Sequence, residues 1–481
     1  MKKDVKAFLK TKRKTVDYRP VPERLKDYKE VAFIPGPELS KEQSSRCMDC
    51  GIPFCHWGCP VGNYIPEWND AVAFGFWNKA FNLLDETNNL PEVTGRVCPA
   101  PCEHSCVLGI NDDPVTIREN ELSIIEHAFK EGLIKPQPPK KRTDKKIAVI
   151  GSGPAGIAAA AQLNKAGHRV VVFEKDKMPG GIMRYGIPDF KLEKKIIERR
   201  IKLLEDEGIE LRTETNVGKD YSSKQLAKDF DATILAIGSR TPRDLKIEGR
   251  ELEGVYFAMD YLIQSNCRVS KEDISGQELI DAKGKKVIVI GGGDTGSDCV
   301  GTANRQGASS VIQIEVMPKP PECRIEDYPW PKYPLLLKVS SSHQEGVERH
   351  WAILTKKFIG KNNKLEKLSC LKVEFEKDSR GCPLMREIHN SEFQIEADMA
   401  VLAIGFLHPE HSGLVKDLNL DLDDRGNLKS DDNYMSSAKG IFVAGDARRG
   451  QSLIVHAISE GRKAAHSLDK FLMGKSSLPN F

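Results

Sequence analysis

Long hydrophobic runs are missing from this 481-residue chain, and no stretch approaches the roughly 20 apolar residues of a membrane-spanning helix. A strong charge of one sign is missing as well, because 72 basic and 69 acidic side chains leave a net charge of +3. That balance does not indicate nucleic-acid binding. The basic run at residues 2–14 is not followed by the apolar segment of a secretory signal. We therefore expect a soluble cytoplasmic protein.

Cysteine is absent from residues 107–266, yet seven of the twelve cysteines crowd into residues 47–106. In a reducing compartment, such a group is more typical of a metal or redox site than of a disulfide framework. The first four have the spacing C-x2-C-x4-C-x3-C-P, which is similar to the cluster-binding run of bacterial ferredoxins. The seven cysteines are Cys47, Cys50, Cys55, Cys59, Cys98, Cys102 and Cys106.

The ferredoxin run predicts how these cysteines are shared between two [4Fe–4S] clusters. In that run the fourth cysteine, which precedes a proline, binds the other cluster. Applied here, the rule assigns Cys47, Cys50 and Cys55 to one cluster. It assigns Cys59 to a second cluster, together with the three cysteines at positions 98–106.

Seven thiolates cannot supply the eight ligands of two such clusters. Either one cluster has an open or non-cysteine position, or fewer clusters are present. Acidic oxygens after the last cysteine are natural substitutes, and Glu119, Glu121 and Glu126 are the candidates. Zinc and a redox dithiol are the alternatives for the thiols. The three-residue spacing within VCPAPCEHSC, and the distance of the cysteines from the glycine motifs, favour iron–sulfur.

A glycine motif, Gly151-x-Gly153-x-x-Gly156, lies between a predicted strand, IAVI, and a predicted helix, IAAAAQL. The first glycine permits the tight turn, the second lets a pyrophosphate approach the backbone, and the third lets helix and strand pack closely. The helix N-terminus favours phosphate. Glu174 ends the next strand, where an acid holds the ribose hydroxyls of a dinucleotide.

A second unit repeats this pattern with Gly291, Gly293 and Gly296, and Glu315 ends its second strand. Two such units predict two dinucleotides, a bound flavin and a nicotinamide carrier. Glu315 favours a free 2′-hydroxyl and hence NADH. Arg305, at the end of the intervening helix, is a candidate ligand for a 2′-phosphate, so the carrier is written here as NAD(P)H.

The segments PGGIMRYGIP and GIFVAGDARRGQSLIVHAISEGRKAA complete the pattern. Their order resembles the flavoproteins in which FAD occupies the first unit and NAD(P)H an inserted second one. The resemblance implies that Asp446 contacts the ribityl–pyrophosphate region, and that a helix starting at Ser452–Val455 points its N-terminal end at the isoalloxazine. Further candidate cofactor contacts in these motifs are Pro154, Ala155, Gly181, Gly238, Asp294, Thr295, Gly405, Gly445, Ser452, Leu453 and Val455.

We expect an α/β protein with two Rossmann-like dinucleotide-binding domains, one inserted in the other, and an N-terminal α-helical iron–sulfur domain. The predicted limits are 1–145 for the helical domain with two [4Fe–4S] clusters, 146–283 and 390–481 for the FAD domain, and 284–389 for the NAD(P)H domain. The polar stretch KPQPPKKRTDKK is typical of a linker. The proline-rich MPKPPECRIEDYPWPKYP is expected to be a surface loop, either functional or a plain connection.

Nearly the whole chain resembles one family, the small subunits of glutamate synthase. The resemblance covers DYRPVPERLKDYKE, CMDCGIPFCHWGCPVGNYIPEWND, GRVCPAPCEHSCVLGI, both glycine loops and GDARRGQSLIVHAISEGR. It slightly favours NADPH as the carrier. Resemblance to proteins with an oxygen ligand at about this distance after the last cysteine favours Glu121 as the eighth cluster ligand.

The family implies an NAD(P)H-dependent oxidoreductase. The small subunit oxidises NAD(P)H at FAD and passes electrons through its clusters to a large subunit, which makes L-glutamate from glutamine and 2-oxoglutarate. A hetero-oligomer with that large subunit is therefore implied, with no catalytic acid or base on this chain, because the cofactors supply the redox chemistry. The alternative is a related iron–sulfur flavoprotein feeding another partner, similar to dihydropyrimidine dehydrogenase or to electron-bifurcating transhydrogenase subunits.

Overall fold

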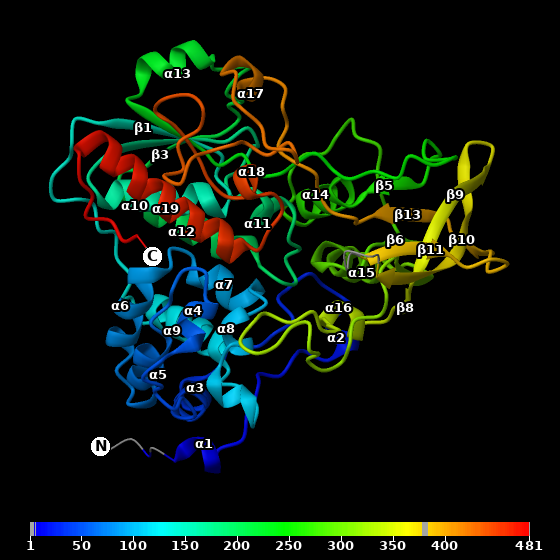
Figure 1. The fold of residues 1–481 in the computed structure, drawn as a ribbon, viewed down its shortest axis with the longest axis horizontal. Coiled ribbons are helices and arrows are strands. Elements are labelled where there is room, and N and C mark those ends of the chain that lie inside the picture. Colours follow the sequence, from blue (N-terminus) through cyan, green and yellow to red (C-terminus); the bar gives the residue numbers. More distant parts are fainter. Residues whose placement is uncertain (1–3, 5, 378–382, 481) are drawn as a thin grey trace.

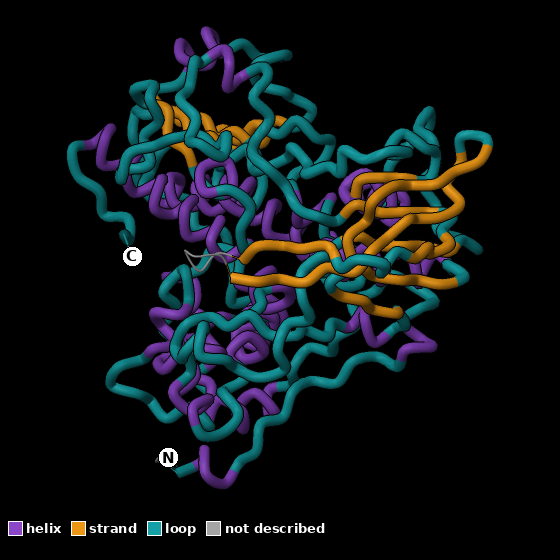
Figure 2. The backbone as a smooth tube through the Cα atoms, turned by 45° about the vertical axis from the view of Figure 1, so that its right-hand side comes forward, coloured by secondary structure: helices purple, strands orange, loops and turns teal. Residues whose placement is uncertain are grey.

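The computed structural model describes the chain except for residues 1–3, 5, 378–382 and 481. The predicted fold class is confirmed: a helical N-terminal part lies beside two parts built on parallel sheets (Figure 1). Figure 2 shows the strands in two groups, while helices dominate the N-terminal part. Among the described residues, no helix is both long and apolar enough to cross a bilayer.

Short helices with proline in their first turn build the N-terminal part. Proline is tolerated there because its missing N–H has no intrahelical partner at that position, and α3, α5, α7 and α8 all begin this way. Trp68, Leu84 and Ile124 are buried between these helices. The helices are α1 (Ala7–Lys10), α2 (Val21–Arg24), α3 (Pro37–Ser45), α4 (Phe54–Gly58), α5 (Ile65–Ala73), α6 (Trp77–Thr87), α7 (Pro91–Val97), α8 (Pro101–His104), the 3-10 helix η1 (Val107–Ile110) and α9 (Ile117–Lys130).

The first dinucleotide-binding unit has a five-stranded parallel sheet in the order β14-β4-β1-β2-β3. Its strands are β1 (Lys146–Ile150), β2 (Arg169–Phe173), β3 (Glu210–Arg212), β4 (Ala232–Leu235) and β14 (Ile441–Val443). Its helices are α10 (Pro154–Lys165), α11 (Ile182–Tyr185), α12 (Lys194–Asp206), α13 (Ser223–Asp229), α17 (Leu414–Asp417), α18 (Asp446–Arg449) and α19 (Ile454–Met473). Helices α10 and α19 cross closely, since a Cβ on Gly461 would lie 2.1 Å from the Ala155 carbonyl oxygen.

The second dinucleotide-binding unit has a parallel sheet in the order β5-β13-β6-β7-β8. Its strands are β5 (Val255–Phe257), β6 (Lys286–Ile290), β7 (Ser310–Glu315), β8 (Glu348–Trp351) and β13 (Met399–Leu402), and its helices are α14 (Ala258–Val269), α15 (Asp294–Gln306) and α16 (Ser341–Gln344). An antiparallel sheet extends from it, formed by β9 (Ile353–Lys361), β10 (Lys364–Lys377), β11 (Pro383–Glu387) and β12 (Phe393–Glu396).

The second unit reaches beyond the predicted limits of 284–389. Strands β5 and β13 lie outside those limits, yet β13 pairs with both β5 and β6 in the second sheet. The boundary prediction is corrected accordingly, because the apolar run MAVL completes the second sheet as the similar run ATIL (β4) completes the first.

The segment before α3 extends along all three parts of the molecule. Tyr18 and Ala32 form an antiparallel bridge, so this segment doubles back on itself. The Val31 amide donates to the Phe190 carbonyl of the first unit at 3.0 Å. The Arg24 guanidinium donates to the Ser341 carbonyl of the second unit at 3.1 Å. The helical part is thereby tied to both dinucleotide-binding units.

Candidate functional site

The glycine loop of the first unit has the geometry that its motif predicts. Gly151 has a φ of +101°, which a residue with a side chain rarely adopts. A Cβ on Gly156 would lie 1.9 Å from the Gly151 carbonyl oxygen, so helix α10 can pack here only with glycine. A Cβ on Gly153 would meet nothing within 4 Å, which leaves open space where the motif places a pyrophosphate.

The loop of the second unit repeats this geometry. Gly291 has a φ of +123°, and a Cβ on Gly296 would lie 2.3 Å from its carbonyl oxygen. A Cβ on Gly293 would again meet nothing within 4 Å. Asp294 and Thr295 form the first turn of α15, as Pro154 and Ala155 do in α10. Both loops therefore fit a dinucleotide.

Glu174, which directly follows β2, and Glu315, the last residue of β7, both reach back to their glycine loops. One Glu174 oxygen accepts from the Ser152 amide at 3.1 Å, and the other accepts from the Asp176 amide at 3.0 Å. Glu315 likewise accepts from the Gly292 amide and, at 3.3 Å, from the amide two residues after the strand end. The two carboxylates are thus fixed at the position expected for ribose recognition.

Ser152 was not singled out by the sequence, because a serine between two glycines has no distinctive spacing. Its hydroxyl donates to Glu174 and accepts from the Gly180 amide at 2.9 Å. A Cβ on the neighbouring Gly181 would lie 3.0 Å from Gly153 Cα. The PGG segment therefore closes over the first loop, consistent with the cofactor contact predicted for Gly181.

The C-terminal motif lies beside the first loop. Gly445 has a φ of +73°, and a Cβ there would lie 2.9 Å from Ala155 Cβ. Asp446 accepts from the Ser452 hydroxyl at 2.7 Å. Burial raises the pKa of Asp446 to about 6, although the hydrogen bond from Ser452 acts in the opposite direction. Helix α19 begins at Ile454, so Ser452 and Leu453 precede it rather than form its first turn.

One acid, Glu460, and two glycines, Gly238 and Gly405, also belong to this region. Glu460, which the sequence did not single out, accepts from the Gly445 amide at 2.9 Å and pairs with Arg448 at 2.9 Å. Gly238 has a φ of +69° with open space at its Cβ position. Gly405, with a φ of +88°, packs against the Gln451 side chain, where a Cβ would lie 2.6 Å from Oε1.

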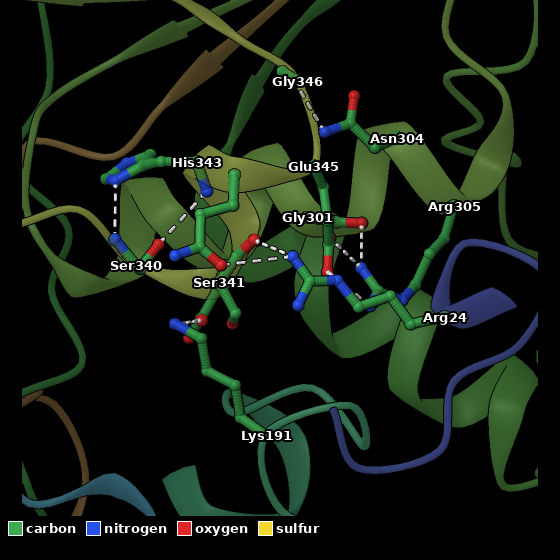
Figure 3. Close-up of polar contacts among 12 residues, drawn as sticks. Arg24, Lys191, Gly301, Asn304, Arg305, Ser340, Ser341, His343, Glu345 and Gly346 are labelled. Carbon is green, nitrogen blue, oxygen red and sulfur yellow. Dashed lines mark hydrogen bonds and ion pairs between the residues drawn. The ribbon is translucent and has the colours of Figure 1, made fainter. Parts of the chain in front are cut away.

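Arg305 is not available to bind a 2′-phosphate, which corrects that prediction. Its side chain has no exposed surface, and it forms a two-pronged ion pair with Glu345 (Figure 3). Its Nε donates to the Asp27 carbonyl at 3.1 Å, and its guanidinium carbon lies 3.8 Å from the centre of the Phe190 ring. Arg24 binds the same carboxylate at 2.9 Å. The arginine is therefore part of a buried network between domains.

The seven clustered cysteines line two separate small cavities in the helical part. The first cavity is lined by four of them: Cys47, Cys50, Cys55 and Cys106. The second cavity is lined by the other three together with a carboxyl group: Cys59, Cys98, Cys102 and Glu121. The structure thus brings together all eight predicted ligands, four around each cavity.

This grouping differs from the predicted one at Cys106. Sequence proximity placed Cys106 with Cys98 and Cys102, but helix α8 ends at His104 and the chain turns away. Cys106 has extended backbone angles, with φ −61° and ψ 128°, and lies at the first cavity. Glu121 consequently completes the second set rather than the first.

Glu121 is deeply buried and held in one orientation. Its Oε1 accepts from Asn88 at 2.8 Å, from Thr94 at 2.9 Å and from Asn63 at 3.5 Å. None of these three hydrogen bonds uses Oε2, which leaves that oxygen for a ligand in the cavity. Burial raises the pKa of Glu121 to about 7. Glu119 and Glu126 are engaged elsewhere, with the Val16 amide and with two arginines.

Burial keeps the clustered thiols protonated when no metal is bound. Burial raises the pKa of Cys59 to about 11 and that of Cys98 to about 12, so both are neutral at pH 7 without a metal. A bound metal ion supplies the positive charge that makes the thiolate stable in such surroundings. Within the described part of the chain, no three His, Cys, Asp or Glu side chains gather tightly enough for one ion. The donors instead surround cavities, as a larger iron–sulfur cluster needs.

The second cavity adjoins the region predicted to bind flavin. Its lining includes Val455, from the first turn of α19. The first cavity has an exposed neighbour, because its lining residue Phe54 contacts the ring of Trp57, which is 68% exposed. Of the two cavities, only the second is lined by a residue of α19.

The proline-rich loop at residues 317–334 packs against the cysteine segments (Figure 1). The rings of Trp330 and Phe54 are 4.6 Å apart. The Ser105 hydroxyl donates to the Pro331 carbonyl at 3.0 Å. The loop therefore does more than connect β7 with α16, since it covers both cysteine-bearing helices, α4 and α8.

Comparison with family models agrees with this division. Residues 145–461 match the family described as pyridine nucleotide-disulphide oxidoreductase. Residues 24–133 match the model described as dihydropyrimidine dehydrogenase domain II, 4Fe-4S cluster.

Several curated proteins are similar over nearly the full chain. The glutamate synthase [NADPH] small chain of Mycobacterium tuberculosis is 51% identical over 480 residues, covering 99% of this chain and 97% of that protein. The protein of the same name from Bacillus subtilis is 46% identical and covers 98% and 99%. The glutamate synthase [NADH] of Saccharomyces cerevisiae is 46% identical over 99% of this chain, which spans only 23% of that longer protein.

A solved structure supports the fold of the two dinucleotide-binding units. FprA from Mycobacterium tuberculosis in complex with NADPH aligns with a TM-score of 0.57 at 20% identity, covering 70% of this chain and 85% of that one.

Proposed function

The chain belongs to the glutamate synthase small-chain family, and on that premise we propose that it oxidises NAD(P)H at a bound FAD and passes the electrons through two [4Fe–4S] clusters to a glutamate synthase large chain. A flavin supplies the chemistry that links a hydride donor to one-electron acceptors. The large chain would then use those electrons to form L-glutamate from glutamine and 2-oxoglutarate.

One observation carries the proposal: the second thiol cavity is lined in part by Val455, the last residue of the segment Ser452–Val455, which runs into the first turn of α19. This segment lies beside Asp446 and the first glycine loop, where the flavin is proposed to bind. Cys59, Cys98, Cys102 and Glu121 would hold the cluster nearer the flavin. The first cavity, with four cysteines, would hold the outer cluster.

The exposed apolar side chains beside the first cavity support an electron exit there. Trp57 stacks edge-on against Phe54 at 5.2 Å while presenting most of its surface to solvent. Exposed aromatic residues of this kind are enriched in the centres of protein interfaces. We therefore place the large chain over Ile52 and Trp57.

The proposal is tested on the full chain purified without oxygen. We expect about eight iron atoms, a matching amount of acid-labile sulfide and one FAD per chain. Adding NAD(P)H to the isolated chain should bleach the flavin absorbance. A preparation with zinc and no sulfide, or flavin reduction that needs the large chain, would contradict the proposal.

A pair of variants tests the exit face. Trp57→Ala should weaken binding of the large chain about tenfold or more, while the rate of flavin reduction by NAD(P)H stays unchanged. Phe76→Ala is the matched control, because Phe76 is 60% exposed but stacks on Phe74, which lines neither cavity, whereas Trp57 contacts Phe54, which lines the first. Equal loss of binding in both variants would place the interface elsewhere.

A further inference from the structure

The carboxyl end of the second sheet carries an aromatic ring with two cations near it. Strands β7 and β8 are parallel, with Gln313 opposite Arg349 and Glu315 opposite Trp351. Residues two apart in a strand point to the same face, and so do register partners in neighbouring parallel strands. These four side chains therefore share one face of the sheet.

That face is the one on which the second glycine loop lies. Gln313 Nε2 donates to the Gly291 carbonyl at 2.9 Å, and Glu315 accepts from the Gly292 amide. A dinucleotide on this loop places its adenosine ribose at the acid that ends the second strand. Arg349 and Trp351, one strand further out, therefore flank the adenosine end of the site.

Lys319 joins this group from the loop that follows β7. Its Nζ lies 5.8 Å from the centre of the Trp351 ring, and the Arg349 guanidinium carbon lies 4.9 Å from it. Lys319 pairs with the exposed Glu322 at 3.1 Å, and one Arg349 nitrogen donates to the Lys338 carbonyl at 3.0 Å. An ammonium has three donors and a guanidinium five, so both keep donors for a ligand.

We propose that Lys319 and Arg349 bind the 2′-phosphate of NADPH beside the Trp351 ring, and that they set a preference for NADPH over NADH. The inference rests on the proposed function, because it concerns the same coenzyme site. Lys319 and Arg349 take the role that the sequence predicted for Arg305, whose guanidinium is buried against Glu345.

Glu315 does not prevent a phosphate from binding nearby. Its two oxygens already accept from backbone amides of Gly292 and Met317, and hydrogen bonds to charged groups disperse part of the charge. The flavin unit differs at the equivalent place. There the residue two positions after the acid is Asp176, which pairs with Arg240 at 2.7 Å and so engages a nearby cation, in keeping with the unphosphorylated ribose of FAD.

Direct binding gives a test that does not depend on turnover. The full chain is titrated by calorimetry with 2′,5′-ADP and with 5′-ADP. The first ligand carries one phosphate at the 2′ position and one at the 5′ position, whereas the second carries both at the 5′ position. We expect the wild type to bind 2′,5′-ADP about tenfold or more tightly, as for charge-assisted hydrogen bonds to phosphate. Lys319→Glu and Arg349→Gln should each abolish most of that difference, whereas Lys361→Ala, an exposed lysine of β9, should not.

Coenzyme kinetics provide the second readout. Lys319→Glu should lower kcat/KM for flavin reduction by NADPH at least tenfold and leave that for NADH within about twofold. A wild type that binds both adenosine ligands equally, or a Lys319→Glu variant that loses both coenzymes equally, overturns the inference. If neither coenzyme reduces the flavin while 2′,5′-ADP still binds through Lys319, the proposed function fails and the phosphate site remains.

Discussion

The glycines of each loop differ in their surroundings, in line with the different roles that the motif gives them. Gly156 is fixed by the Gly151 carbonyl oxygen, whereas Gly153 faces open space. A methyl group at Gly156 would have to displace helix α10 from β1, while a methyl group at Gly153 would displace only a ligand. The same substitution should therefore affect folding at one position and cofactor binding at the other.

Gly156→Ala should lower the free energy of unfolding of the flavin-free chain by about 3 kcal/mol, which is typical of overpacking against a rigid backbone. Gly153→Ala should change that free energy by less than about 1 kcal/mol, yet yield protein with much less bound FAD. Urea unfolding and the flavin-to-protein absorbance ratio measure the two effects. Full FAD occupancy in Gly153→Ala would show that the phosphates do not approach this residue.

Asp446 should make the flavin-free chain less stable as the pH rises. Its pKa is about 6 in the fold, against an ordinary value of 3.8, so the folded state binds the proton more tightly. The stabilisation is complete below pH 4 and is lost as the pH rises through 6. A pKa difference of about two units corresponds to a change of about 3 kcal/mol in the free energy of unfolding.

In the Asp446→Asn variant the side chain cannot ionise. The difference in unfolding free energy between wild type and variant should therefore change by about 3 kcal/mol from pH 4 to pH 7. Urea titrations at several pH values measure the difference. A difference that stays constant with pH would mean that the Asp446 carboxyl is more accessible to water than the structure shows.

At the scale of elements, the short helix α8 decides which cysteines act together. Cys102 lies within α8 and Cys106 beyond its end, so the helix separates two thiols only four residues apart. The cysteine set could be recognised from the sequence because spacing and composition are local properties. The grouping could not, because it depends on where the chain turns after His104 and on Asn88 and Thr94 orienting Glu121.

Paired cysteine variants test the grouping. Cys47→Ser and Cys106→Ser should each remove one cluster, leaving about four iron atoms per chain, and the double variant should lose no more than either single one. Cys47→Ser combined with Cys102→Ser should remove nearly all the iron.

Iron and sulfide analysis of chains purified without oxygen gives the counts. If Cys106→Ser behaves additively with Cys47→Ser but not with Cys102→Ser, the grouping predicted from the ferredoxin spacing is right and the one in the structure is not.

Across the whole molecule, buried charges join the three parts. Glu92 of the helical part binds Arg200 of α12 through both oxygens at 2.7 and 2.8 Å. Glu345 of the second unit binds Arg24 of the N-terminal segment and Arg305 of its own unit (Figure 3). Removing one member of such a network leaves an uncompensated buried charge.

Glu345→Gln should lower the free energy of unfolding by about 3–5 kcal/mol, because it leaves Arg24 and Arg305 facing each other without an anion. Glu348→Gln is the matched control, since Glu348 pairs with His350 at the surface, with the two side chains 66% and 41% exposed, and should change stability by less than about 1 kcal/mol. Denaturant titration measures both. Equal, small effects would mean that Glu345 is not buried in solution.

The sequence predicted the two dinucleotide-binding units well because each strand, loop, helix and acid lies within about 30 consecutive residues. It failed at Arg305, because the partner Glu345 is 40 residues away and no local pattern signals the pairing. It also missed the link between the proline-rich loop and the cysteine helices, since the Trp330–Phe54 contact joins residues far apart in the chain.

The stretch before β1 looks like a place where the chain can be divided, but the ion pairs on either side of it indicate otherwise. A protease that cut at residues 136–145 would leave Arg200 joined to Glu92, and Arg199 to Glu126, with no covalent bond between the fragments. Such a nicked protein should migrate as two bands under denaturing conditions and as one particle under native conditions. Expressing either fragment alone would expose an unpaired buried ion, so neither piece is a self-sufficient module.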